Sequence, residues 1–306
     1  MAKTRAIRKR IISVRNIYKI TRTMERVAQS KVMKLTGRLA HANGMRDEVD
    51  RFLPVALGAD LGSVRAAQEL ELLPLTAHRA PIKKVLLFCV TSSRGLCGGY
   101  NSRVIGAAKE RMAGLRAEGR EPELAVMGRK GLAYFRFYNQ PVLIPLADTD
   151  ENLPFSFIDE TAVDIMARYL RGEFDGVEVI STRYKTKMVQ HVRRSVLLPF
   201  APSAERAQAA VPKVAALGAA EPYLREPSRS ELLEVVLPMA VTLELFCTVL
   251  EAFLCEHAQR AVAMHSASDN AQSMIKTLTL TYNRARQAQI TNEMIEIVSG
   301  SEGSRK

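Results

Sequence analysis

The sequence predicts an α/β protein in which two very long terminal helices flank a central domain with a mostly parallel sheet. Apolar residues recur every three or four positions over residues 3–57 and again over 230–298, which is the spacing of one apolar stripe on a helix. Between these segments, short apolar runs alternate with helical patterns, an order typical of parallel sheets. At ~1.5 Å per residue the helices would extend ~80 and ~100 Å. A domain of this size cannot bury them, so they must pair with each other, enter a partner, or both.

The first helix is predicted to carry a narrow apolar stripe on an otherwise basic and polar surface. Gly37 and Gly44 weaken this helix, and Pro54 predicts a bend near its end. The stripe consists of Ile7, Ile11, Val14, Ile17, Ile20, Met24, Val27, Val32, Leu35 and Leu39.

Most of the net charge of the chain lies in this helix. Residues 1–40 contain twelve Lys or Arg against one acidic residue, Glu25, which gives +11 of the +12 carried by the whole chain. A helix with this excess repels itself and needs an acidic partner surface, a polyanion or an anionic membrane. From the residues alone, a nucleic-acid-binding coiled coil is therefore an alternative, although no aromatic residue beyond Tyr18 is interleaved with the charges.

The centre of the chain is predicted to alternate strands and helices, followed by an Ala- and Pro-rich linker at 201–228. This order favours an α/β domain. Strands are predicted at 84–91, 123–127, 141–145 and 176–183, helices at 102–116, 129–138 and 157–170, and a hairpin or edge strand at 189–198.

The second helix is predicted to begin at Ser228 or Ser230, because either serine could cap it and Glu231 suits the positive end of the helix dipole. Pro238 predicts a kink or a local opening, and the tail 299–306 is predicted to fray. The second half of the helix is rich in Ala and Thr, small residues that let two helices approach closely. Its stripe consists of Leu232, Val235, Val236, Met239, Leu243, Phe246, Leu250, Phe253, Ala261, Met264, Ala271, Ile275, Leu278, Ala285, Ala288, Met294 and Ile297.

Several classes of protein are disfavoured by composition. The sequence has no unbroken run of ~18 apolar residues, so no transmembrane helix is predicted, and no apolar segment of a secretory signal follows the basic N-terminus. Cys89, Cys97, Cys247 and Cys255 have neither CxxC spacing nor a His at ligand spacing, so packing is expected rather than zinc or disulfides. The five histidines are scattered, and no catalytic constellation stands out.

A glycine-rich turn at 92–101 follows the first predicted strand and opens a helix, as a phosphate cradle does. Its glycines Gly95, Gly98 and Gly99 fit neither GxGxxG nor a Walker A sequence. A structural turn is the favoured interpretation, and a nucleotide-binding α/β enzyme is the alternative.

Three parts of the chain carry motifs that resemble those of the gamma subunit of F-type ATP synthases. The C-terminal helix carries MHSASDNA at 264–271, LTLTYNRARQA at 278–288 and ITNEMIEIV at 290–298. The N-terminal helix carries IRKRIISVRN at 7–16, KITRTM at 19–24 and VAQSK at 27–31, and the centre carries RGLCGGYN at 94–101. The match covers nearly the whole chain in order.

The resemblance implies a central stalk. The two terminal helices, 1–58 and 229–298, would form a long antiparallel coiled coil, and residues 80–200 would form a Rossmann-like α/β domain. The coiled coil would enter the cavity of the alpha3beta3 hexamer, and the α/β domain would contact the epsilon subunit and the membrane c-ring. The chain would couple ion flow to ATP synthesis or hydrolysis by rotation. It would have no active site, cofactor or metal of its own and no nucleic acid partner, and it would lie peripherally on the cytoplasmic face of the bacterial plasma membrane.

The resemblance also assigns contact residues. Arg286, Gln287 and Thr291 match polar residues that engage a loop of one beta subunit, Arg260 matches another polar shaft contact, and Met24 is expected opposite it on the N-terminal helix. The foot that touches the c-ring and epsilon would consist of Tyr223, Leu224, Arg225, Glu226 and Pro227.

Two departures from the family pattern stand in the sequence. Ser93 replaces the usual Asp before the Arg of the glycine turn, and a polar tail, 301–306, replaces a small apolar one.

Overall fold

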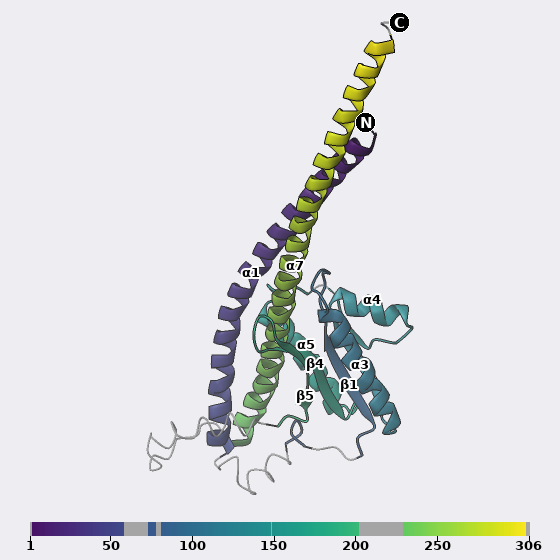
Figure 1. Ribbon diagram of the computed structural model, residues 1–306. Helices are drawn as coiled ribbons and strands as arrows, with labels where there is room; N and C mark the ends of the chain where they lie inside the picture. The colour runs from purple at the N-terminus through teal and green to yellow at the C-terminus, as the bar shows by residue number, and fades with distance from the viewer. Residues whose placement is uncertain (1, 58–72, 78–80, 148, 202–228, 304–306) are drawn as a thin grey trace. The chain divides into compact units, whose positions relative to one another are not determined.

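The computed structural model describes residues 2–57, 73–77, 81–147, 149–201 and 229–303. It contains the two predicted long helices, α1 (Ala2–Leu57) and α7 (Arg229–Gly303) (Figure 1). The chain divides into two compact units, residues 1–30 with 260–306 and residues 31–259. Each long helix therefore contributes to both units.

The second unit is built around a five-stranded sheet of order β3-β2-β1-β4-β5. Four strands are parallel, and β5 runs antiparallel to β4 at one edge, which confirms the mostly parallel sheet and the edge strand. The strands are β1 (Lys84–Val90), β2 (Glu121–Met127), β3 (Ile144–Leu146), β4 (Gly176–Tyr184) and β5 (Gln190–Leu198).

Side-chain alternation along β1 divides the core of this unit into two layers. Leu86 and Phe88 face one cluster, with α5 and parts of α1 and α7, whereas Val85 and Leu87 face the other, with α3 and α4 (Figure 1). The buried strands are apolar on both faces because helices cover both faces. The shorter helices are α3 (Tyr100–Ala117), α4 (Arg129–Phe137) and α5 (Phe155–Leu170).

The long helices are more continuous than their prolines and glycines predict. α1 continues past Pro54 to Leu57. α7 contains Pro238 without a break, where the neighbouring Leu237 and Val241 are buried in the sheet core and hold the segment in place. α7 also continues to Gly303, so residues 299–303 of the predicted tail are helical.

One helix among the described residues passes a membrane-span test of length and composition, the α7 segment Glu231–Ile295. This segment contains no unbroken apolar run of ~18 residues, because isolated polar residues interrupt it. However, 56% of its apolar window is buried inside the protein, and α7 residues from Leu233 to Leu254 belong to the sheet core. Packing within the domain accounts for the apolar composition.

The four cysteines are buried, as expected for packing residues. Burial raises the pKa of the Cys89 thiol to about 12. A raised thiol pKa leaves little reactive thiolate at neutral pH.

Candidate functional site: the paired terminal helices

In the first unit, the start of α1 pairs with the second half of α7 in antiparallel orientation. As the residue number increases along α1, the residue number of the partner on α7 decreases. The pairs are Thr4 with Gln289, Thr21 with Ser268 and Glu25 with His265, at 3.0, 2.8 and 3.0 Å. This confirms the antiparallel coiled coil.

The seam between these helices is small and partly polar. On α7 the buried residues follow the three–four spacing of a coiled coil, and most are small. They are Ala261, Met264, Ser268 and Ala271, and the adjacent Arg260 is also buried. On α1 the buried residues of this unit are Val14, Thr21, Glu25 and Ala28.

Between residues 17 and 27, the apolar stripe predicted for α1 does not form the seam with α7. Ile17 and Ile20 are 52% and 59% exposed, and Met24 and Val27 also face away from the seam. The polar pairs and small residues of α7 let the helices meet along a neighbouring face of α1, because close approach there satisfies Thr21 and Glu25. The larger apolar side chains are left exposed by the part of the chain that the structure describes.

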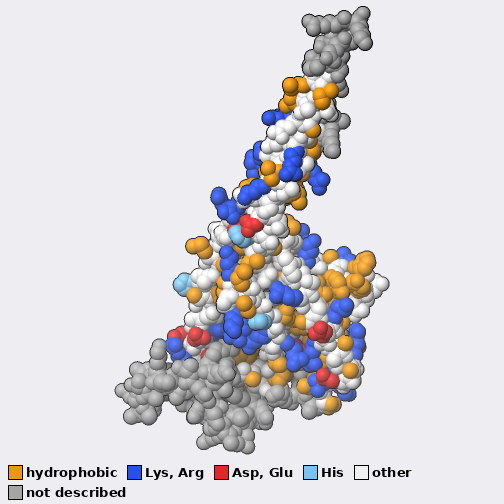
Figure 2. Space-filling model, viewed as in Figure 1, with side chains coloured by type: hydrophobic (Ala, Val, Ile, Leu, Met, Phe, Trp, Pro, Cys, Tyr) orange, Lys and Arg blue, Asp and Glu red, His pale blue; other side chains and the backbone are white. Residues whose placement is uncertain are grey.

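The uncovered face of the paired helices combines apolar and cationic side chains. Ile12, Ile17 and Ile20 are exposed among the Lys and Arg residues of α1. Figure 2 shows these two kinds of side chain next to one another along the helices. A surface of this composition suits a partner that offers apolar walls and acidic groups.

Glu25 is the polar centre of the seam. It is buried, and it accepts hydrogen bonds from Arg22 at 2.9 Å and Gln29 at 3.3 Å within α1. His265 of α7 lies at 3.0 Å from the same carboxylate, and its other ring nitrogen lies 3.4 Å from Asp269. A buried polar group of this kind fixes the register of two helices, since any slip leaves it unpaired.

Replacing Glu25 with Ala is expected to destabilise the paired helices by about 1.5–3 kcal/mol, the usual contribution of hydrogen bonds to a charged group. Amide hydrogen exchange across 14–28 and 261–271 should accelerate accordingly. His265→Ala should cost less, since the His265 side chain is 57% exposed and exposed ion pairs contribute ~0–1 kcal/mol. The exposed His41 provides a control substitution; equal exchange rates in Glu25→Ala and His41→Ala would contradict the expected role.

The residues expected to contact a beta subunit lie in different environments. Arg286, Gln287 and Thr291 are exposed on α7. The Thr291 hydroxyl donates a hydrogen bond to the Gln287 carbonyl at 3.0 Å, so Gln287 and Thr291 lie on one face of the helix. Met24 is partly exposed, whereas Arg260 is buried. Glu25, the neighbour of Met24, pairs with His265 of α7, and the expected opposition of Met24 and Arg260 stays a prediction.

The predicted foot residues, 223–227, lie outside the described residues. The same is true of residues 202–228 of the predicted linker, 201–228.

In the second unit, the loop before α5 clamps both long helices. Lys31 of α1 forms an ion pair with Glu151, and His257 of α7 lies 3.4 Å from the other oxygen of that carboxylate. Arg38 donates to the Leu153 carbonyl at 3.0 Å. Sequence reasoning missed this clamp, because its members come from three distant segments.

The pKa of Glu151 reflects its position in the clamp. Burial raises this pKa, but the hydrogen bond from Lys31, a backbone hydrogen bond and the charges of Lys31 and His257 outweigh burial and lower it from 4.5 to about 2. A depressed carboxyl pKa stabilises the fold fully above the unfolded value, and this contribution is lost as pH falls through the folded value.

The stability difference between the unsubstituted chain and Glu151→Gln is therefore expected to be constant above pH 4.5 and to shrink as the pH falls toward about 2. Urea unfolding of both proteins at a series of pH values measures it. A difference that does not change with pH across this window would show that the Glu151 charge does not stabilise the clamp.

The glycine turn is tied by its own side chains, as the structural interpretation predicts. Asn101 accepts from the Ser92 amide at 2.9 Å and donates to the Ser92 hydroxyl at 2.7 Å. Tyr100 donates from its buried hydroxyl to the Val90 carbonyl at 3.1 Å, and Ser93 donates to the Ala147 carbonyl at 3.2 Å. These bonds fix the start of α3 on the end of β1.

Comparisons with known proteins agree with this geometry. The family model described as ATP synthase matches residues 3–303. The ATP synthase gamma chain of Geotalea daltonii is 36% identical over 302 residues, covering 99% of both chains, and that of Trichlorobacter lovleyi is 35% identical over 302 residues, with the same coverage.

Solved structures share the fold. A chain of the Euglena gracilis mitochondrial ATP synthase OSCP/F1/c-ring structure aligns with a TM-score of 0.66 at 19% identity, covering 99% of this chain and 94% of that one. A chain of the Tetrahymena thermophila central stalk/c-ring structure aligns with a TM-score of 0.55 at 23% identity, covering 81% and 99%. An antiparallel pair of terminal helices joined to a parallel-sheet domain thus defines a central-stalk class of fold. Within that class, the chain belongs to the ATP synthase gamma-chain family.

Proposed function

We propose that the chain is the central-stalk rotor subunit of an F-type ATP synthase. It couples ion flow through a membrane c-ring to ATP synthesis or hydrolysis at an alpha3beta3 hexamer by rotating within it. The chain itself is non-catalytic and holds no cofactor. It lies peripherally on the cytoplasmic face of the bacterial membrane, in contact with alpha, beta, epsilon and the c-ring.

The observation that carries this proposal is the uncovered face of the paired helices. Ile17, Ile20 and Val27 are exposed beside Arg and Lys residues of α1. Leaving three such side chains in water costs several kcal/mol relative to burial. A surrounding partner with apolar walls and acidic loops would recover that free energy.

A rotor needs one asymmetric face and a firm attachment to the part that is driven. The paired helices supply the asymmetry, because α1 carries most of the excess positive charge. The Glu151 clamp supplies attachment, because it joins both long helices to the sheet domain. In thermodynamic terms the angle of the shaft acts as a ligand, and nucleotide affinity at each catalytic site shifts with it.

Arg286, Gln287 and Thr291 are the proposed polar contacts with a beta subunit, and their exposure on α7 supports this role. Met24 is proposed as an apolar contact. Arg260 is proposed as a further shaft contact, although its burial calls for a rearrangement or for contact through its tip. The foot at 223–227 is proposed to meet the c-ring and epsilon.

The proposal is tested by expressing the full chain with its alpha and beta partners and purifying through a tag on this chain. We expect a complex with ATPase activity and one copy of the chain per three alpha and three beta subunits. The isolated chain should hydrolyse no ATP. Purification of the chain alone, or of the chain with nucleic acid, would overturn the rotor proposal.

Coupling is tested in membranes that contain the whole enzyme. Arg286→Ala with Gln287→Ala should lower ATP-driven ion pumping more than ATP hydrolysis, because the contact transmits rotation. Lys185→Ala with Lys187→Ala, on the exposed β4–β5 turn, is the matched control and should leave the ratio unchanged. If the ratio of ion pumping to ATP hydrolysis is the same in both double variants, Arg286 and Gln287 do not make the assigned contact.

A further inference from the structure

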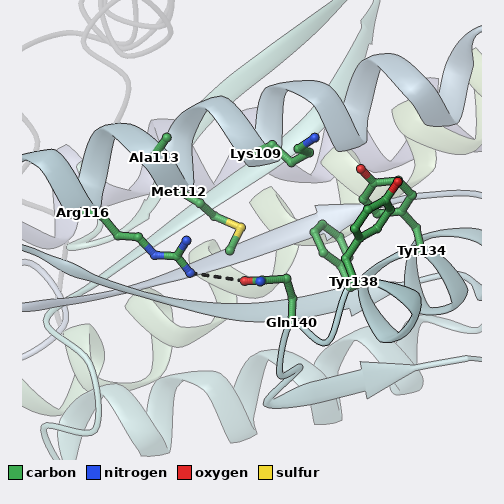
Figure 3. A pocket seen from close by; sticks show the side chains of 8 residues that line it. Lys109, Met112, Ala113, Arg116, Tyr134, Tyr138 and Gln140 are labelled. Atoms are coloured by element: carbon green, nitrogen blue, oxygen red, sulfur yellow. Dashed lines mark hydrogen bonds between the residues drawn. The ribbon is translucent and has the colours of Figure 1, made fainter.

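A groove between α3 and α4 lies outside the paired helices and has no role in the proposed function. Its volume is about 310 Å³, within the range of ligand pockets, and eight residues line it (Figure 3). Met112 and Phe135 are buried and form its floor. The groove lies within the sheet unit, on the side of the sheet covered by α3 and α4.

Two cations mark the ends of the groove. Lys109 and Arg116 are seven residues apart on α3, which is two helical turns or ~10 Å. Arg116 donates to the Gln140 side chain at 3.2 Å, which orients the guanidinium across the groove (Figure 3). None of the eight lining residues is acidic, and two, Lys109 and Arg116, are cationic, so the lining itself carries positive charge.

Aromatic rings form the other wall and continue beyond it. Tyr134 and Tyr138 pack with their ring centres 4.7 Å apart, and Phe137 packs edge-on against Tyr138 at 5.1 Å. Phe137 is 79% exposed and Tyr138 is 55% exposed. Phe135 is the buried aromatic residue of α4 and Tyr134 packs partly against the same core cluster, whereas Phe137 and Tyr138 project from it. Exposed aromatic clusters next to Arg and Met are typical of protein interfaces.

We propose that this groove binds an acidic amphipathic helix of a partner protein. The partner helix would place two carboxylates two turns apart against Lys109 and Arg116, with an apolar side chain between them over Met112 and the tyrosines. The spacing of the cations equals the i, i+7 spacing of a helix. A small anion could neutralise one end but would leave Phe137 in water, so the extended aromatic surface favours a protein partner.

The test uses the full chain and a labelled helical peptide with Glu at two positions seven apart and Leu between them. The same peptide with Lys in place of Glu is the control probe. Fluorescence anisotropy should show binding of the acidic peptide only. Since the chain contains no tryptophan, Phe137→Trp places a unique fluorophore beside the groove, and its emission should change on binding.

The double variant Lys109→Glu with Arg116→Glu should bind the acidic peptide at least tenfold more weakly than the unsubstituted chain. It should also bind the basic peptide. Lys185→Glu with Lys187→Glu changes the net charge equally away from the groove and should alter binding less than twofold. Circular dichroism checks folding, and Lys109→Gln with Arg116→Gln replaces the reversal if it fails to fold.

Three results would overturn the proposal. One is no binding of the acidic peptide up to millimolar concentration, and another is equal weakening in both double variants. The third is displacement of the peptide by ADP, if ADP also changes the tryptophan emission of the Phe137→Trp protein as the peptide does. That result would assign the groove to a small anion instead.

Discussion

Replacing Gly131 with Ala is expected to lower the free energy of unfolding by about 3 kcal/mol, at the upper end of overpacking effects. An added Cβ would lie 2.5 Å from the Thr91 hydroxyl and 2.8 Å from a methyl group of Val126. Both neighbours are buried or held in strands and are β-branched, so neither can rotate away cheaply. The Gly131 amide also donates to the Thr91 hydroxyl at 3.0 Å, and a shift of α4 would lengthen that bond.

Gly106→Ala is the matched control, because Gly106 lies in the interior of α3 with nothing within 4 Å of an added Cβ. This change should stabilise the protein by up to about 1 kcal/mol, the difference in helix propensity. Urea unfolding of both variants measures the contrast. If Gly131→Ala unfolds at the same urea concentration as Gly106→Ala, the close approach of α4 to β1 is not needed for stability.

This approach also places α4 for the groove described above. Thr91 donates to the Met127 carbonyl at 2.6 Å while accepting from Gly131, so one hydroxyl joins β1, the end of β2 and the start of α4. A displaced α4 would move Tyr134 and Tyr138 relative to Lys109. We therefore expect the Gly131→Ala protein, where it folds, to bind the acidic peptide more weakly as well.

The order of strands and helices could be predicted from sequence because it depends on local patterns. The strand predicted at 84–91 is apolar on both faces, and it is a central strand covered on both sides. The glycine turn was likewise predictable as a turn. The close approach at Gly131 was not, since a glycine inside a helix carries no sign of which neighbour it meets.

The coiled-coil seam shows where periodicity fails. A pattern search weights large apolar residues and therefore selects Ile17, Ile20 and Val27, which are exposed. The true seam includes Thr21 and Glu25, whose burial depends on Ser268 and His265 more than two hundred residues away. An apolar stripe on a shaft that enters a partner can face that partner, so the period of the stripe alone does not identify the helix it pairs with.

Reversing the charge of Glu151 is expected to destabilise the sheet unit strongly. Glu151→Lys would place a third cation beside Lys31 and Arg38, whose contacts hold the loop on α1. Breaking a largely buried ion pair costs about 3–5 kcal/mol, and the partial exposure of Lys31 favours the lower end of that range. Urea unfolding should show this loss, with faster amide exchange in residues 31–42.

The same substitution tests whether the effect is electrostatic. Adding Lys31→Glu to Glu151→Lys restores opposite charges at the same positions, so at least half of the lost stability should return. Arg171→Glu is the matched control, because it reverses an exposed pair with Glu173 at 2.8 Å, which should cost less than ~1 kcal/mol. A swap that restores nothing would mean that Glu151 acts through the shape of the loop. In that case ion pumping by the assembled enzyme should tolerate Glu151→Gln, whereas a clamp that transmits torque through its charge should lose coupling in Glu151→Gln before it loses assembly.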